Sequence, residues 1–228
     1  MQAEIETITL PLPMRMGTVN CYLVDTDGRH VLVDTGGSNA RRQLVERLQS
    51  AGCTRDSLDL VVLTHGDFDH IGNAAYIRSI LDAKIAMHPD DLGMAERGDM
   101  FVSRKKPNLL IRALLPLLYP FGESQRFTPD IALQDGLDLA PFGLHAKVVH
   151  LPGHSLGSIG LLTTEGDLLC GDLFENTKGP GLNSLMDDLQ AAAASVRRLH
   201  PLNIGTVYPG HGPPFPMRAL ERTDAGAG

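Results

Sequence analysis

The chain has 228 residues, 43% of them hydrophobic, with a formal net charge of −7 and a pI near 5.7. This length can bury a substantial core, and we expect a single domain over residues 1–228. The acidic balance argues against nucleic acid or an anionic membrane as the main partner, because both attract clustered Lys and Arg. The basic run at 104–106 is too small to change that expectation.

Cysteine usage and the absence of targeting patterns narrow the setting further. Three widely spaced cysteines without a C-x-x-C pair form neither a disulfide framework nor a thiolate zinc site. The N-terminus lacks the pattern of a signal peptide, and no apolar run is long enough to span a bilayer. We therefore expect a cytoplasmic protein.

Strands and helices alternate along the chain. The pattern predicts strands at 19–24 and 30–34 joined by a turn, then a helix from about 40 to 50 that Ser38 and Asn39 could cap. A buried strand at 58–64, a helix at 71–81 and a strand at 83–87 follow. Later strands are predicted at 146–151, 158–164, 167–170 and 205–208, with a helix at about 186–199. This mixture predicts a layered α/β fold.

The segment from about 91 to 129 differs from the rest and is predicted to be a helical insertion. Its residues 107–121 are apolar on nearly every side and are interrupted by prolines that end or kink a helix. Packing against the main body or a dimer partner is one explanation. A lid over a site, or a patch for an apolar substrate, is the other.

Histidines and aspartates gather at predicted strand ends. Four of them stand in the stretch T-H-G-D-F-D-H, directly after the strand at 58–64, and the others lie in glycine-rich turns. The candidate metal ligands are His65, Asp67, Asp69, His70, His154, Asp172 and His211. Imidazole with carboxylate is the ligand mixture of divalent metals, and seven such groups can complete two adjacent sites bridged by Asp172. The remaining histidines are expected to be structural, and His88, directly before Pro89, is the strongest further candidate among them.

The combination T-H-x-x-x-D-H, P-G-H-S, G-D and P-G-H-G, preceded by V-D-T-G-G, resembles the metallo-β-lactamase-fold superfamily of hydrolases over residues 17 to 213. The resemblance implies a four-layer αββα sandwich with two metals at one edge of its sheets. It assigns His65, Asp67 and His154 to the first metal. It assigns Asp69, His70 and His211 to the second, with Asp172 as bridge. Asp34 matches a buried aspartate that orients ligands without binding metal.

The sequence departs from the family at one position. The usual pattern is H-x-H-x-D-H, and here Asp67 replaces the second histidine. A carboxylate adds negative charge and a harder oxygen, which shifts preference toward iron or manganese without excluding zinc. Asp67 could also swing away and leave a mononuclear or damaged first site.

These features predict a metal-dependent hydrolase in which a metal-bound hydroxide attacks an ester, thioester, lactone or amide carbonyl of a small molecule. Asp69 is the expected proton acceptor and donor. Tyr22 and Tyr208 could donate to an oxyanion, although packing roles are commoner. Glyoxalase-II-like thioesterases are disfavoured, because they carry an extra C-terminal helical region. The alternative is a non-catalytic metal-binding or di-iron redox protein. A homodimer is possible.

Overall fold

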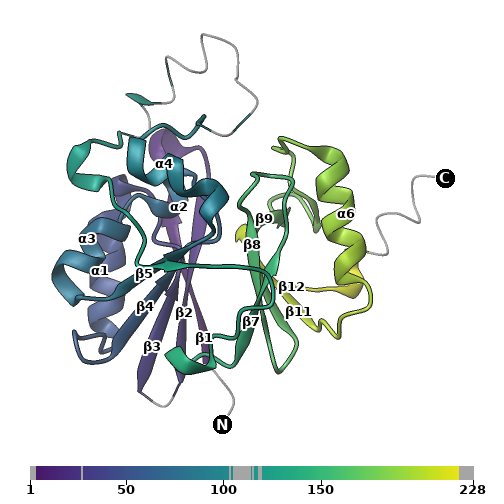
Figure 1. The fold of residues 1–228 in the computed structure, drawn as a ribbon, viewed down its shortest axis with the longest axis horizontal. Helices are drawn as coiled ribbons and strands as arrows, with labels where there is room; N and C mark the ends of the chain where they lie inside the picture. Colours follow the sequence, from purple (N-terminus) through teal and green to yellow (C-terminus); the bar gives the residue numbers. More distant parts are fainter. Residues whose placement is uncertain are drawn as a thin grey trace.

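The structure is a computed structural model that describes residues 4–26, 28–102, 104, 114, 116–117 and 120–220. Two β-sheets face each other, with α1 and α3 outside one sheet and α6 outside the other (Figure 1). The four-layer αββα arrangement implied by the sequence is therefore confirmed.

The first sheet runs in the order β1-β2-β3-β4-β5-β6. Its first three strands pair antiparallel, and β3 to β6 run parallel. The strands are β1 (Glu4–Pro11), β2 (Thr18–Thr26), β3 (Arg29–Val33), β4 (Leu58–Val62), β5 (Lys84–Met87) and β6 (Ile131–Ala132).

The second sheet runs in the order β12-β11-β9-β8-β7, and β10 pairs with β9 at the side. Its pairs are antiparallel except for β9 with β11, which run parallel. The strands are β7 (Ala146–His150), β8 (Ile159–Thr163), β9 (Asp167–Glu175), β10 (Gly181–Leu182), β11 (Thr206–His211) and β12 (Phe215–Pro216).

The described helical segments are α-helices and shorter 3₁₀ turns. The α-helices are α1 (Arg41–Ser50), α2 (Phe68–Ile71), α3 (Ala74–Leu81), α4 (Leu92–Arg97) and α6 (Leu189–Leu199). Short 3₁₀ turns are η1 (Pro13–Arg15), η2 (Ser38–Ala40), η3 (Pro89–Asp91), η4 (Glu123–Gln125) and η5 (Ala140–Phe142).

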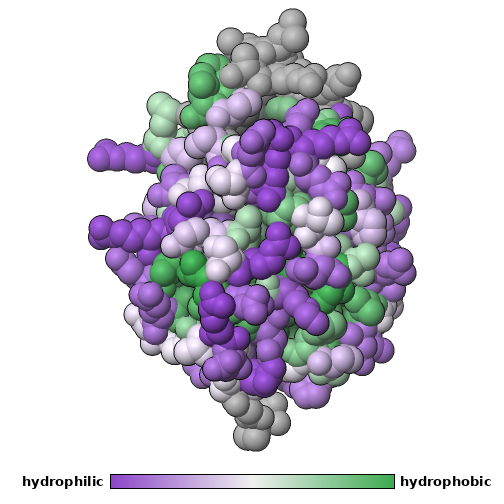
Figure 2. All heavy atoms as spheres, turned by 60° about the vertical axis from the view of Figure 1, so that its left-hand side comes forward, coloured by the Kyte–Doolittle hydropathy of each residue, from purple (hydrophilic) through white to green (hydrophobic). Residues whose placement is uncertain are grey.

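The face that comes forward in Figure 2, on the α1 and α3 side, is largely hydrophilic, with hydrophobic residues showing between the polar ones.

Three apolar clusters hold the four layers together. Along β4, Leu60 and Val62 face the second sheet, whereas Val61 and the following Leu63 face the helical layer of α1 and α3. This alternation follows from the two-residue period of a strand, and it explains why β4 is apolar at nearly every position. A third cluster, which includes Phe174, packs the second sheet against α6.

Three local expectations need correction. Asp172 and His211 lie within β9 and β11 rather than in turns after them, because both strands continue through register irregularities around Pro209. Ser38 and Asn39 do not cap α1 with their side chains. They form η2 instead, and Asn39 Nδ2 donates to the carbonyl of Pro11, 2.8 Å away.

The insertion predicted at 91–129 is only partly described. Its described elements are α4, the end of η3, and η4, while most of residues 105–119 lie outside the described residues. Phe121, at the end of the apolar segment, is buried and stacks on Phe68 with ring centroids 4.4 Å apart. This contact places the end of the segment against α2.

A buried carboxylate joins loops that belong to different sheets. Asp91 is fully buried, and its Oδ1 accepts from the backbone N–H of Gly157 at 2.9 Å. Its Oδ2 accepts from the Gly66 N–H at 2.9 Å and from the Ser155 hydroxyl at 2.5 Å. Gly66 follows β4 of the first sheet, and the other two donors lie between β7 and β8 of the second. Asp91 therefore fixes the two loops to each other.

Changing Asp91 to Asn should destabilise the protein by about 2 kcal/mol, because an amide N–H₂ would face a backbone donor and leave buried polar groups unpaired. Urea unfolding of the variant would measure the loss. Asp90→Asn is the matched control, because the Asp90 carboxylate neighbours Asp91 in the sequence but is exposed. Equal stability of the two variants would contradict the role given to Asp91.

The loop between β7 and β8 also depends on a glycine. Gly153 has a φ of +150°, and an added Cβ would lie 2.6 Å from the Cα of Ala192 in α6. Gly153→Ala should therefore cost about 2–3 kcal/mol through backbone strain and overpacking. Gly181→Ala is the control, because an added Cβ there meets nothing within 4 Å. Thermal melts that show the same small loss for both variants would contradict the expectation.

Candidate metal centre

The seven candidate ligands come from both sheets and meet at one end of the sandwich. His65 and Asp67 stand in the loop after β4, and Asp69 and His70 belong to the short helix α2. The second sheet supplies the rest: His154 from the loop between β7 and β8, Asp172 from β9, and His211 from the end of β11. Sequence segments more than 140 residues apart thus converge.

Each of the four imidazoles is held through Nδ1, which leaves Nε2 directed into the centre. The Nδ1 of His65 lies 3.0 Å from the Thr64 hydroxyl, and that of His70 lies 2.9 Å from Asp34 Oδ2. The Nδ1 of His154 lies 2.5 Å from the Leu185 carbonyl, and that of His211 lies 2.7 Å from the Thr18 carbonyl. Carbonyls and carboxylates only accept, and the Thr64 hydroxyl donates its proton to Asp34 Oδ2, so it can accept from His65. These contacts therefore favour the tautomer with an N–H at Nδ1 and a lone pair at Nε2.

Asp34 organises the loop that carries two of these histidines. Its Oδ1 accepts from the Thr64 N–H at 2.9 Å, and its Oδ2 accepts from the Thr64 hydroxyl at 2.8 Å as well as from His70 Nδ1. The backbone of Asp34 has a φ of +60°, a left-handed conformation that costs energy for a non-glycine residue. The structure thus places Asp34 behind the centre, in hydrogen-bonding rather than direct contact with it.

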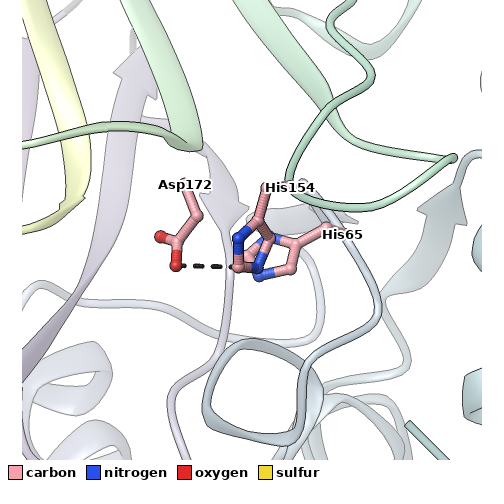
Figure 3. Close-up of side chains that lie close together, drawn as sticks. All are labelled: His65, His154 and Asp172. Atoms are coloured by element: carbon pink, nitrogen blue, oxygen red, sulfur yellow. Dashed lines mark ion pairs between the residues drawn. The ribbon is translucent and has the colours of Figure 1, made fainter. Parts of the chain in front are cut away.

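The ligand-type atoms form two groups, each compact enough to hold one ion. His65, His154 and Asp172 form the first, and Asp69, His70 and His211 form the second, with the candidate atoms of each group within 4.8 Å of one another. Figure 3 shows the three side chains of the first group pointing toward each other from separate elements.

Asp172 touches both groups. Its Oδ2 lies 3.8 Å from His154 Nε2 and 3.3 Å from His211 Nε2, and its Oδ1 lies 3.5 Å from His70 Nε2. Asp69 Oδ2 lies 3.6 Å from His211 Nε2 and 4.0 Å from His70 Nε2. These separations are close to those between ligand atoms that share one ion with bonds near 2.1 Å.

The buried polar atoms fit a metal better than they fit each other. His65 Nε2, His70 Nε2 and Asp172 Oδ1 are buried without a hydrogen-bond partner. Unpaired buried polar atoms are costly, so a cluster of them at one point needs a partner that the chain itself does not provide. A divalent cation is such a partner for imidazole nitrogen and carboxylate oxygen.

Charges within the cluster shift its pKa values strongly. Although burial alone would lower it, the carboxylates of Asp172 and Asp34 raise the pKa of His70 to about 10. Burial is likewise outweighed at His211, where Asp172 raises the pKa to about 9. Burial raises the pKa of Asp69, and the neighbouring carboxylates of Asp67 and Asp172 add to that rise.

Asp67 points into the first group and not away from it. Its Oδ2 lies 3.0 Å from His154 Nε2 and 3.7 Å from His65 Nε2. Its Oδ1 lies 2.7 Å from Arg104 Nη1, and this cation together with His154 outweighs the effect of burial and keeps the pKa of Asp67 well below its usual value. The swung-away position considered from the sequence is therefore not the one seen.

Sequence reasoning missed Arg104 as a member of the site. The residue stands in a short basic run that gave no reason to assign it a partner. The extra carboxylate at 67 was an available signal, because a buried charge needs a counter-charge. That signal does not identify which arginine of the chain supplies the counter-charge.

A cavity of about 480 Å³ opens beside the centre. One side carries Asp67, Asp69, Asp172, His154 and His211. Apolar side chains line much of the remainder, namely Leu12, Met16, Met100, Phe101, Leu185 and Met186. The cavity can therefore present a polar reacting group to the centre and contact an apolar portion of the same molecule.

Other candidates take structural roles. The Tyr22 hydroxyl donates to the Pro209 carbonyl at 2.5 Å, so it is not available to an oxyanion. Tyr208 does not line the described cavity. His88 and His150 form a third group with Asp90, but their rings stack at an interplanar angle of 6°, so their lone pairs run side by side instead of converging.

Known proteins of several kinds resemble this chain. A hydroxyacylglutathione hydrolase, GloC of Haemophilus influenzae, is 28% identical, with 88% of this chain and 89% of that protein covered. The Beta-lactamase-like protein 2 homolog of Drosophila melanogaster is 26% identical over 89% of this chain, which spans only 61% of the fly protein. Because this chain matches GloC over 89% of that protein, the extra C-terminal helical region is not a sufficient reason to disfavour hydroxyacylglutathione hydrolases.

Solved structures of known proteins also resemble this chain. TTHA1623, determined in a di-iron-bound form, is 31% identical and superposes with a TM-score of 0.68, covering 93% of this chain and 97% of that one. TTHA1429 from Thermus thermophilus, a metallo-beta-lactamase family protein, is 26% identical with a TM-score of 0.71, covering 97% and 78%.

Within the described part of the chain, helices long and apolar enough to cross a bilayer are absent.

The family model of the metallo-beta-lactamase superfamily matches residues 14–211, a range that contains every candidate ligand. The order of the ligands, the four layers and the convergence at one sheet edge agree with that match. The chain belongs to the metallo-beta-lactamase superfamily.

Proposed function

We propose that the protein is a metal-dependent hydrolase that cleaves an ester, thioester, lactone or amide bond of a small molecule. The observation that carries the proposal is the position of Asp172 at the wall of an open cavity, where its Oδ2 lies near the Nε2 atoms of both His154 and His211 and its Oδ1 lies near that of His70. A structural metal site would be closed on all sides, whereas a catalytic site keeps an open position.

The proposed ligands divide into two sets. His65, Asp67 and His154 hold the first metal, and Asp69, His70 and His211 hold the second, with Asp172 shared between them. The Nδ1 contacts described above support this division, because each fixes an imidazole with its Nε2 turned to the ion. Asp34 orients His70 and Thr64 from behind.

A bound pair of divalent ions supplies a nucleophilic water at neutral pH and polarises the carbonyl oxygen. The chain's own contribution is to hold the reacting groups and to move protons. Asp69 is suited to the proton transfers, because it lines the cavity and its raised pKa lies nearer to neutrality than that of an ordinary carboxyl group. Its carboxylate accepts a proton before attack and returns one to the leaving group.

The cavity supports a substrate with an apolar portion beside its carbonyl. Met100, Phe101 and Leu185 are among the apolar side chains that line the cavity together with the polar candidate ligands. A thioester or ester of modest size has this distribution of polarity. The hydroxyacylglutathione hydrolase among the relatives, which matches over nearly its whole length, makes a thioester the first substrate class to test.

A di-iron redox or metal-storing protein is the second candidate. The solved di-iron form of TTHA1623, at 31% identity, favours it, as does the harder oxygen ligand at Asp67.

The homodimer and the cytoplasmic location stay predictions. So do the roles considered for the apolar segment at 109–121, which are packing, a lid and a patch for an apolar substrate.

Metal content is the first measurement. Protein stripped with a chelator should bind two equivalents of Zn²⁺ or Mn²⁺, and at free metal 100-fold above Kd its melting temperature should rise by about 5–10 °C. His154→Ala should lose one equivalent and His88→Ala should lose none. Identical stoichiometry in these two variants would contradict the proposed ligand set.

Asp69→Asn should reduce turnover by about 100-fold or more while the metals stay bound, since proton transfer typically contributes that much. The substrate panel comprises S-lactoylglutathione, a p-nitrophenyl ester, an acyl-homoserine lactone and nitrocefin. Asp56→Asn, a change at an exposed position, is the control. Near-normal turnover by a fully metallated Asp69→Asn variant excludes this role. Iron with a redox-dependent spectrum and no hydrolysis of any panel member favours the second candidate.

A further inference from the structure

Arg104 stands in an unusual place for a cation, against the ligand set of a proposed cation site. Its side chain is only 9% exposed, and its guanidinium contacts three separate parts of the chain. Nη1 lies 2.7 Å from Asp67 Oδ1, Nη2 donates to the His154 carbonyl at 3.1 Å, and Nε lies 3.2 Å from Asp187 Oδ2. A buried arginine with these contacts is held in one geometry.

The contacts fix both oxygens of the Asp67 carboxylate. Arg104 Nη1 lies 2.7 Å from Oδ1 and donates to Oδ2 at 3.0 Å, and Oδ2 also faces the Nε2 atoms of His154 and His65. A free carboxylate can rotate about χ2 and offer either oxygen in several directions. The guanidinium removes that freedom, and its second contact, to the His154 backbone, ties the same cation to the next ligand of the first group.

The charged groups around Arg104 are mainly carboxylates. Asp67 and Asp187 are in contact with the guanidinium, and the more distant Asp91 and His154 also interact with it. A histidine at position 67 would be a neutral ligand, whereas Asp67 adds one negative charge to the first group. Arg104 places a positive charge directly against that carboxylate.

We propose that Arg104 is a positioning residue for the first metal, and that Arg104 and Asp67 act as one unit in place of a neutral imidazole ligand. The inference rests on the proposed function for the existence of the first metal site, but it does not depend on hydrolysis. It predicts that metal binding at the first site is weaker when only one of the two residues is present, and that the effects of changing each residue are not additive.

The test titrates metal-free protein with Zn²⁺ against a chromophoric chelator. The binding step that His154→Ala abolishes reports the first site. Arg104→Lys keeps the positive charge but cannot make all three contacts, so affinity at this step should fall by about 10-fold or more, as for other residues that orient ligands. Arg198→Met is the matched control, because it breaks an exposed arginine–aspartate pair that has two contacts of 2.9 Å to Asp135.

A double-mutant cycle separates positioning from simple repulsion between cations. Asp67→His should weaken the first step, because Arg104 then faces a neutral ligand and an ion of its own sign. Adding Arg104→Met to Asp67→His should restore affinity by about 10-fold or more. The same Arg104→Met change beside Asp67 should give no gain, because the loss of the anchor offsets the loss of repulsion.

Equal gains from Arg104→Met in both backgrounds would show a merely repulsive cation and overturn the proposal, as would unchanged affinity in Arg104→Lys. Absence of the first binding step from the wild-type chain would overturn it too. Melting temperatures of the metal-free proteins provide a second readout: each single change should lower the value and the double change should recover most of it. Failure of hydrolysis with an intact cycle would leave the pair standing and reject only the hydrolase.

Discussion

The centre depends on buried lone pairs that the protein does not satisfy. His65, His70 and Asp172 each have a buried side-chain atom without a hydrogen-bond partner in the candidate metal centre. Folding such a cluster costs free energy, because buried acceptors and carboxylates repel one another without an intervening positive charge. The fold offsets that cost elsewhere, in three apolar clusters that together span the four layers.

Two buried aspartates outside the ligand set make the arrangement rigid. Asp34 holds the loop after β4 by its backbone, its threonine hydroxyl and one imidazole. Asp91 connects that loop with the loop after β7. Each accepts three hydrogen bonds, so each behaves as a fixed three-way connector. These paired carboxylates hold the loops that carry several of the candidate ligands.

Much of this could be predicted from the sequence, and the reason is local. Strand β4 is apolar on both faces, and the His/Asp cluster that follows it can occupy only the end of a buried strand. Glycine-rich turns marked His154 and His211 in the same way. The resemblance to the superfamily then supplied the pairing of the two halves, which no local pattern contains.

The residues that sequence reasoning missed are those defined by distant contacts. Position 91 was considered only as the start of the segment at 91–129, and Arg104 only as part of a short basic run. Strand β1 was also missed, although Ile8 and Leu10 alternate with polar residues, because its ends carry glutamate and proline. Only the tertiary contacts of the folded chain show that these positions are buried or paired.

The origin of the ligands in both sheets has a mechanical consequence. One sheet supplies His65 and His70 and the other supplies His154, Asp172 and His211, so an ion bound among them is a cross-link across the seam of the sandwich. A small sliding of the sheets would separate the imidazoles. The geometry of the proposed metal centre would therefore depend on how tightly the two sheets pack against each other.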